Sequence, residues 1–211
     1  MSKVVVVTGS RRGIGKSIVD KFLEEGYNVA GCSKNEKNIV KDNLLLMQVD
    51  VSKISDVKKF YFKVIKKFKD IDVLVNNAGV AFNRSLEDYS IKEIDLTLDT
   101  NLRGLIYFTK IFLSKLKDSK GVIISVSSLA GLKGYSSLSV YCASKFGVVG
   151  FSESLAKELK IKVYCVCPGP VGTDMWTGLG WIKYPGITKP STIANKVFDC
   201  VINKPKELVI K

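Results

Sequence analysis

The stretch KVVVVTGSRRGIG, residues 3–15, decides the fold of this chain. Its four consecutive valines are typical of a strand that is buried on both faces of a parallel sheet. Glycines follow at positions 9, 13 and 15, and an amphipathic stretch over residues 16–25 predicts a helix directly after them. This order lets backbone N–H groups approach a pyrophosphate at the positive end of a helix dipole. The stretch therefore predicts a dinucleotide-binding turn, with an ordinary tight turn as the alternative; the expected contact residues are Gly9, Ser10, Arg11, Arg12, Gly13, Ile14 and Gly15.

Strand-like and helix-like segments alternate along the rest of the sequence. We expect strands at residues 3–7, 27–32, 44–49, 71–75, 121–126, 163–166 and 207–210. We expect helices at residues 16–25, 52–68, 91–117 with an interruption near 101–104, around 141–159, and 191–202. This alternation predicts an α/β protein with a doubly wound Rossmann fold, a parallel sheet of about seven strands flanked by helices on both faces. The length of 211 residues suits one domain, 1–211, and the sequence shows no linker or repeat.

The amino-acid composition excludes several kinds of catalytic and metal site. The chain has no histidine, which excludes Ser-His triads, Cys–His nucleophiles and the usual zinc ligand sets, so no metal is expected. Its five cysteines form no C-x-x-C pair and are expected to be reduced, buried thiols in a reducing compartment. No apolar run is long enough for a membrane span, and no signal-peptide pattern is present. We therefore expect a cytoplasmic protein without membrane association.

The formal net charge is +13, from 33 Lys+Arg against 20 Asp+Glu. Such an excess is compatible with nucleic-acid binding or with an anionic cofactor. However, the lysines are scattered through the helical segments, without a dense run or interleaved aromatic residues. The pattern therefore favours a cofactor over nucleic acid.

The end of the second expected strand bears on which cofactor binds. In dinucleotide folds, a carboxylate at this position binds the ribose 2′-hydroxyl and favours NAD. Here the position holds Ser33 and Lys34, with Arg12 in the preceding turn. Two cations and no carboxylate suit a 2′-phosphate, so the sequence predicts NADP(H) in preference to NAD(H). The alternative is that Lys34 is simply solvated.

Tyr141 and Lys145 stand four residues apart, which places both on one face of a helix. An ammonium near a phenol stabilises the phenolate, so we expect Lys145 to lower the pKa of Tyr141 toward the range of a working acid or base. Taken alone, the pair is more often two residues on a solvated helix.

Asn101 and Gly104 interrupt an apolar helix, where glycine costs about 1 kcal/mol relative to alanine. Either close packing or a distortion that aims Asn101 at a site explains this interruption.

Strand ends supply further polar groups. Asn76 and Asn77 follow the fourth expected strand, and their amides are expected to link neighbouring strands to the glycine turn, unless they form only a polar turn. The segment PGPVGT, residues 168–173, follows the sixth strand, and ligands bind at such carboxyl ends in open α/β sheets. We expect a short substrate loop at about residues 174–190. Its large apolar residues predict a lid over an apolar substrate or, equally, a small satellite core: Met175, Trp176, Leu179, Trp181, Ile182 and Tyr184.

Together these motifs resemble the short-chain dehydrogenase/reductase family over essentially the whole chain. The resemblance rests on TGxxxGIG at residues 8–15, Asp50, NNAG at 76–79, Asn101, Ser128, YxxxK at 141–145 and PG at 168–169. It implies a catalytic set of Asn101, Ser128, Tyr141 and Lys145. It also implies cofactor contacts from Ser33, Lys34, Asp50 near the adenine, Val51, Asn77, Ala78, Gly79, Tyr141, Lys145, Pro168, Gly169, Val171, and Thr173 near the nicotinamide carboxamide.

The function expected from this resemblance is NADP(H)-dependent interconversion of a carbonyl and an alcohol, with Tyr141 as general acid or base. A small, apolar carbonyl or alcohol substrate is expected. A homodimer or homotetramer is expected too, with the helices around Asn101 and Tyr141 as the available interface. The chain is shorter than the usual family member and lacks its glycine-rich ending. The resemblance therefore does not identify the substrate. The alternatives are a non-catalytic NADP-binding regulator or scaffold on the same fold, and an isomerase or dehydratase of the same family.

Overall fold

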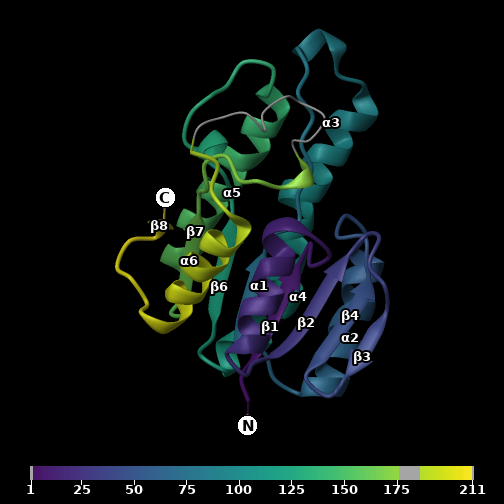
Figure 1. Cartoon of the computed structure of the whole chain (residues 1–211), viewed down its shortest axis with the longest axis vertical. Coiled ribbons are helices and arrows are strands. Elements are labelled where there is room, and N and C mark those ends of the chain that lie inside the picture. The colour runs from purple at the N-terminus through teal and green to yellow at the C-terminus, as the bar shows by residue number, and fades with distance from the viewer. Residues whose placement is uncertain (1, 176–185, 211) are drawn as a thin grey trace.

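The computed structural model describes residues 2–175 and 186–210. One sheet of eight strands runs through the molecule in the order β3-β4-β2-β1-β5-β6-β7-β8 (Figure 1). The strands are β1 (Val4–Thr8), β2 (Asn28–Ser33), β3 (Ile39–Lys41), β4 (Leu44–Gln48), β5 (Val73–Asn76), β6 (Val122–Val126), β7 (Lys162–Val166) and β8 (Val209–Ile210). The helices are α1 (Gly13–Glu24), α2 (Ile54–Phe68), α3 (Ile91–Leu98), α4 (Gly104–Asp118), α5 (Ser139–Glu158) and α6 (Pro190–Ile202).

The central strand β1 is buried on both faces, as its valines predicted. Val5 and Val7 belong to the apolar cluster under α1 and α6, whereas Val6 belongs to the cluster on the opposite face. A strand with apolar side chains on both sides is stable only between two helical layers, which is the arrangement of a parallel sheet. The predicted doubly wound Rossmann fold is therefore confirmed.

Two helical layers cover the sheet. Helices α1 and α6 pack side by side over one face, in front of the sheet in Figure 1. On the other face, α2 and α4 meet through an aromatic cluster in which the rings of Phe108 and Phe112 stack and Phe60 lies tilted against both. Helix α5 continues this second layer, where Leu155 belongs to the same core.

The order of the strands determines where a ligand can bind. From β1 the chain moves outward through β2 to β4, and then returns to place β5 on the opposite side of β1. The strand order therefore reverses between β1 and β5, and their carboxyl ends open a crevice at the top of the sheet. In open α/β sheets such a reversal is where ligands bind.

Three elements differ from the sequence-based expectations. The antiparallel edge strand β3 was missed, because three residues that include Val40 at 70% exposed give no periodic signal. Helix α2 starts at Ile54 rather than residue 52, since Ser52 instead hydrogen-bonds the carboxylate of Asp50. The long helix 91–117 is divided by a π-helical turn at Asp99–Arg103.

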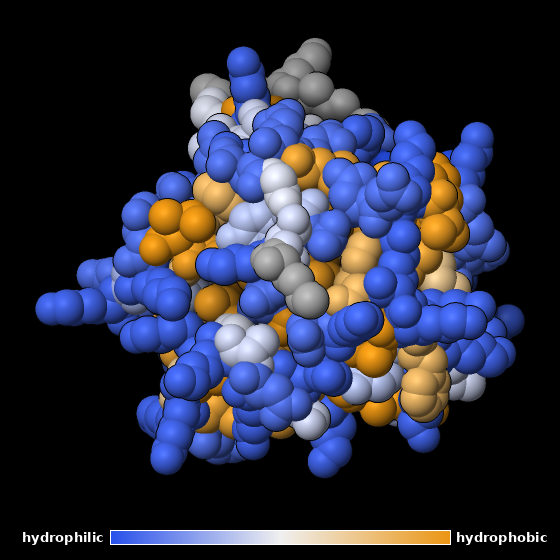
Figure 2. Space-filling model, turned by 90° about the horizontal axis from the view of Figure 1, so that it is seen from below, coloured by the Kyte–Doolittle hydropathy of each residue, from blue (hydrophilic) through white to orange (hydrophobic). Residues whose placement is uncertain are grey.

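Polar and charged residues dominate the surface at the end of the molecule that Figure 2 shows. Figure 2 shows the lower end of the molecule, where hydrophilic side chains prevail and apolar ones are scattered among them. All five cysteines are buried and none of them forms a disulfide, as expected. Within residues 2–175 and 186–210, no helix is both long enough and apolar enough to cross a membrane.

Candidate active site

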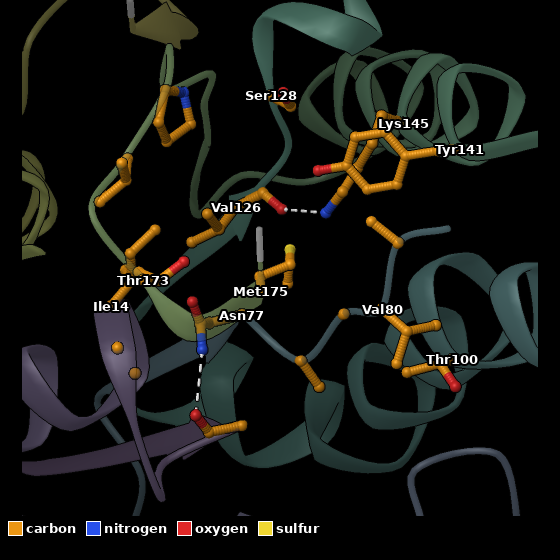
Figure 3. Close-up of a pocket in the computed structure, with 18 of the residues that line it drawn as sticks. Ile14, Asn77, Val80, Thr100, Val126, Ser128, Tyr141, Lys145, Thr173 and Met175 are labelled. Atoms are coloured by element: carbon orange, nitrogen blue, oxygen red, sulfur yellow. Dashed lines mark hydrogen bonds between the residues drawn. The ribbon is translucent and has the colours of Figure 1, made fainter. Parts of the chain in front are cut away.

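A cavity of about 1130 Å³ opens at the carboxyl ends of the strands. The predicted cofactor residues line it with one exception, Ser10, which is 4% exposed and lies behind the lining. Of the four predicted catalytic residues, Ser128, Tyr141 and Lys145 line the same cavity, whereas Asn101 does not. Figure 3 shows Tyr141 and Lys145 projecting from one helix toward the space that Ser128 borders.

The glycine turn brings three segments into contact. Gly9 has φ +70, and a Cβ there would lie 2.9 Å from the Cα of Ala78. A Cβ on Gly15 would overlap the carbonyl oxygen of Gly9. Both positions therefore require glycine, because any side chain would separate the turn from the strand beside it.

The amide of Asn77 links the two central strands, as predicted. Its Nδ2 donates to the carbonyl oxygen of Thr8 at 2.9 Å, and the hydroxyl of Thr8 accepts from the backbone N–H groups of Asn77 and Ala78. Asn76 has a different partner, since its Nδ2 donates to the hydroxyl of Thr109 in α4. Only the second asparagine therefore connects β5 to the glycine turn.

The start of α1 fits a pyrophosphate. The first N–H groups of a helix have no partner within it, and the side chain of Arg12 does not cap them. Gly13, Ile14 and Gly15 line the cavity at this point, so their backbone is open to a ligand. Free donors, the helix dipole and a glycine cradle form the donor set that a dinucleotide requires.

At the end of β2, the positive charges of the expected basic site are partly neutralised by carboxylates. Lys34 forms an ion pair with Asp50 at 3.1 Å, and Arg12 pairs with Asp174 at 3.5 Å. Burial alone would raise the pKa of Asp50, but hydrogen bonds from Ser52 and Lys34 hold it below its usual value. The strand end itself holds Ser33, but a further carboxylate lies behind it: Glu36, three residues beyond, accepts from the hydroxyl of Ser10 at 2.6 Å and does not line the cavity.

Tyr141 and Lys145 are both enclosed by the protein. Nζ of Lys145 donates to the carbonyl oxygen of Val126 at 2.9 Å and lies 5.8 Å from the centroid of the Tyr141 ring (Figure 3). Burial lowers the pKa of Lys145 to about 8. Burial also raises the pKa of Tyr141 to about 12, although a hydrogen bond with Ser128 acts in the opposite direction.

The predicted lowering of the Tyr141 pKa by Lys145 is therefore wrong for this structure. Removal from water disfavours the phenolate, and this effect outweighs the Ser128 hydrogen bond. The ammonium donates to the backbone carbonyl of Val126 in β6. Tyr141 is accordingly a neutral hydrogen-bond donor at physiological pH.

Asn101 lies in the π-helical turn and is 1% exposed. Its Oδ1 accepts from the N–H of Val80 at 2.8 Å, and its Nδ2 donates to the carbonyl of Val80 and to the hydroxyl of Ser144. The side chain thus fixes Val80, which lines the cavity, to the helix that carries Tyr141. The π-helical distortion therefore directs Asn101 at the back of the cavity wall and not into the cavity itself.

Close packing explains the adjacent glycine. A Cβ on Gly104 would lie 2.8 Å from Cγ2 of Val51 and 3.0 Å from its carbonyl oxygen. Both of the explanations considered for the interrupted helix therefore apply, each to a different residue. Because Val51 also lines the cavity, the close approach of α4 shapes the wall of the site.

Sequence reasoning missed most of the apolar wall. Phe82, Leu96, Tyr135 and Leu138 line the cavity beside Tyr141. Only Phe82 carried a usable signal, because it follows closely after the NNAG segment at the end of β5. Of the predicted loop, Met175 lines the cavity, and the remaining named positions lie outside the described residues: Trp176, Leu179, Trp181, Ile182 and Tyr184.

A doubly wound sheet, a glycine turn at a helix start and a Ser–Tyr–Lys cluster at the strand ends define a nucleotide-dependent oxidoreductase. The sequence profile of the short chain dehydrogenases matches residues 3–180. The chain belongs to this family and is an oxidoreductase.

Curated relatives agree with this assignment. The chain is 36% identical over 193 residues to 3-oxoacyl-[acyl-carrier-protein] reductase FabG of Staphylococcus epidermidis, which covers 85% of this chain and 79% of the relative. It is 36% identical over 204 residues to the protein of the same name in Chlamydia muridarum, covering 87% and 82%.

Solved structures share the fold. An alcohol dehydrogenase from Thermococcus sibiricus complexed with 5-hydroxy-NADP matches 100% of this chain and 94% of its own at 27% identity, with a TM-score of 0.85. A serine dehydrogenase complexed with NADP+ matches 98% and 93% at 26% identity, with a TM-score of 0.88. A Burkholderia phymatum family member in complex with NAD, at 19% identity, covers 99% and 88% with a TM-score of 0.87 and supports the fold alone.

Proposed function

We propose that this protein reduces a ketone or aldehyde to the alcohol with NADP(H), with Tyr141 as the general acid. The observation that carries the proposal is the hydrogen-bonded pair of Ser128 and Tyr141 beside Lys145, at the strand ends where α1 offers its free N–H groups. A bound nicotinamide would supply the hydride that reduces the carbonyl carbon.

The chain's own groups stabilise the charge that develops on the substrate oxygen. Tyr141 donates its proton to that oxygen, and Ser128 donates a hydrogen bond to it. Lys145 binds the ribose hydroxyls of the cofactor, and its charge offsets the phenolate left on Tyr141. Asn101 has one lone pair of Oδ1 uncommitted in the hydrogen bonds described above, and it holds the water that links Lys145 to solvent.

The protonation state of Tyr141 favours the reductive direction. With its pKa raised to about 12, the phenol carries its proton at neutral pH and is ready to act as an acid. Alcohol oxidation needs the phenolate, which is scarce until the pH rises or bound groups lower the pKa. Reduction is therefore the reaction for which the site is prepared.

We propose NADP(H) as the preferred cofactor because Arg11, Arg12 and Lys34 line the cavity near the end of β2. For the substrate we propose a neutral, largely apolar carbonyl compound, since Val80, Phe82 and Leu138 present no charge near Tyr141. The two FabG relatives are named as reductases of 3-oxoacyl-[acyl-carrier-protein], and a 3-oxoacyl group falls within this class.

We propose that the protein is a cytoplasmic homodimer with no nucleic-acid or membrane partner, and that residues 1–211 act as one domain. The dimer proposal is supported by apolar exposure on the helices around Asn101 and Tyr141, with Leu98 36% and Phe146 46% exposed. Sedimentation analysis tests the dimer: the wild-type protein should sediment as a dimer and Phe146→Glu as a monomer. A monomeric wild-type protein would contradict it.

The deciding experiment compares Tyr141→Phe with a matched control, Tyr164→Phe. Tyr164 is a buried tyrosine of β7 whose hydroxyl donates to the carbonyl of Pro205, away from the cavity. Carbonyl reduction should fall at least 10³-fold in Tyr141→Phe, while NADPH binding is kept and Tyr164→Phe retains turnover. If Tyr141→Phe reduced a panel of carbonyl compounds at the wild-type rate, the proposed function would be wrong.

A further inference from the structure

Carboxylates accompany the cations at the part of the cavity next to the end of β2, and one of these carboxylates, Glu36, lies behind the lining. The three cations are Arg11, Arg12 and Lys34, and the three carboxylates close to them are Glu36, Asp50 and Asp174. Asp50 and Asp174 are each paired with a basic side chain. Glu36 instead has two serine hydroxyls as its side-chain partners, Ser10 and Ser33.

The two hydroxyl groups point at the same carboxylate oxygen. Oγ of Ser10 lies 2.6 Å from Oε2 of Glu36, and Oγ of Ser33 lies 3.4 Å from that oxygen. The backbone N–H of Glu36 also donates to the carbonyl of Ser33 at 3.2 Å, which closes a tight turn after β2. The carboxylate therefore stands directly behind the strand end.

Ser10 has little freedom to turn elsewhere. It is 4% exposed, and a Cβ on Gly31 would lie 2.8 Å from its hydroxyl oxygen, so Ser10 occupies the space that this glycine leaves. A hydroxyl has one proton and two lone pairs. Since Ser10 and Ser33 direct their protons at Glu36, Ser33, which lines the cavity, presents lone pairs to a ligand.

This arrangement distinguishes the two forms of the cofactor. A ribose 2′-hydroxyl can donate its proton to the lone pair of Ser33, whereas a 2′-phosphate has only acceptor oxygens to offer. The phosphate also meets the negative charge of Glu36 behind the serines, at a distance where unit charges still interact appreciably. The cations attract the phosphate, and Glu36 opposes it.

We propose that Glu36 is a specificity-determining residue that limits the preference for the 2′-phosphate, so that the protein also accepts NADH. This inference rests on the proposed function, since it concerns the cofactor of the same site. Glu36 acts through Ser10 and Ser33 and is a positioning residue. Neutralising it should remove the negative charge behind the strand end, free the Ser33 hydroxyl to donate to the ligand, and increase the preference for NADPH.

The experiment titrates NADPH and NADH into the purified full-length protein and follows the fluorescence of the reduced nicotinamide. Glu36→Gln should bind NADPH about five- to tenfold more tightly while NADH affinity changes less than about twofold. Ser33→Ala, which removes the lone pairs but keeps the carboxylate, should shift the ratio of the two dissociation constants in the same direction by a smaller factor. Glu158→Gln, an exposed carboxylate near the end of α5, is the matched control and should leave both constants unchanged.

Each outcome decides between the two proposals. An unchanged ratio in Glu36→Gln and Ser33→Ala would overturn the role of Glu36, even if the wild-type protein binds both cofactors as proposed. If the variants bound NADPH and NADH more weakly by the same factor, Glu36 would only stabilise the turn. That result would also overturn its proposed role in specificity. A wild-type protein that bound neither cofactor would instead contradict the proposed function itself.

Discussion

The ammonium of Lys145 in α5 donates a 2.9 Å hydrogen bond to the carbonyl oxygen of Val126, the last residue of β6. This bond holds a charged group, 5% exposed, against the carboxyl end of the sheet. Burial disfavours the charge and lowers the pKa of Lys145 to about 8. The lysine is therefore placed where its charge is costly, and the stability of the fold should depend on whether it is protonated.

The first prediction concerns pH and stability. Below about pH 8 both the folded and the unfolded chain protonate Lys145, so the cost of burying the charge is present in full. As the pH rises from about 8 toward the unfolded pKa of about 10.4, the unfolded chain binds more protons, and the free energy of unfolding should rise. Other titrating groups contribute in the same range, so the comparison must be with Lys145→Met, which lacks this group.

Urea denaturation provides the measurement. Between about pH 7.5 and 9.5, the free energy of unfolding of the wild-type protein should gain about 2 kcal/mol relative to Lys145→Met. Parallel pH profiles for the two proteins would show that the native lysine keeps its ordinary pKa.

The second prediction separates the two adjacent serines after β6. Ser128 shares a hydrogen bond with Tyr141, whereas the hydroxyl of Ser127 donates to the carbonyl of Lys145 at 3.0 Å. Ser128→Ala should lower kcat about 10²- to 10³-fold with little change in cofactor affinity, because it removes a donor to the reacting oxygen. Ser127→Ala should instead cost about 1 kcal/mol of stability, because it removes a buried hydrogen bond that joins the end of β6 to α5.

Steady-state kinetics and thermal unfolding of both variants test this division of roles. The reverse pattern, with kcat lost in Ser127→Ala and kept in Ser128→Ala, would reassign the functional serine to the first position of the pair.

Features that depend on local sequence were predicted well. The buried strand, the glycine turn and the helix after it are adjacent in the chain, and their order alone places the turn at the carboxyl end of β1. The family motifs then indicated the polar and glycine-rich part of the cavity lining, most of which lies at or just after the carboxyl ends of strands.

Features that depend on burial or distant contacts were not predicted. The four-residue spacing of Tyr141 and Lys145 gave no information on how deeply the helix is buried, and burial reverses the expected pKa shift. The pairing of Arg12 with Asp174 joins residues 162 positions apart. Glu36 stands outside the family motif and becomes relevant only because the turn after β2 folds it back onto Ser10.

The third prediction tests the contact between α4 and the cavity wall. Gly104→Ala places a methyl group 2.8 Å from Val51, and the strain should cost about 1–3 kcal/mol despite the better helix propensity of alanine. NADPH affinity should also fall, because Val51 lines the cavity. Gly150→Ala is the matched control: no atom lies within 4 Å of its added Cβ, so this helical substitution should stabilise the protein by up to about 1 kcal/mol. Equal urea midpoints for the two variants would contradict the packing argument.

The fourth prediction concerns Asn101, whose three side-chain hydrogen bonds connect Val80 in the cavity wall to Ser144 in α5. Asn101→Ala should destabilise the protein by about 1–3 kcal/mol, because it removes the partners of both backbone groups of the partly buried Val80. Asn101→Asp should do no better, since a carboxylate can accept from the Val80 N–H but faces the Val80 carbonyl with a second oxygen in place of a donor. Asn43→Ala, in the exposed turn between β3 and β4, should change stability by less than about 0.5 kcal/mol.

Kinetics then distinguish a structural from a functional role for Asn101. If Asn101 also holds the water that resupplies protons through Lys145, the kcat of Asn101→Ala should fall about tenfold or more at a temperature where the variant is fully folded. NADPH affinity should change much less, because Asn101 does not line the cavity. A folded Asn101→Ala protein with wild-type kcat would restrict this residue to holding the π-helical turn against Val80, and proton resupply would then need another route to Lys145.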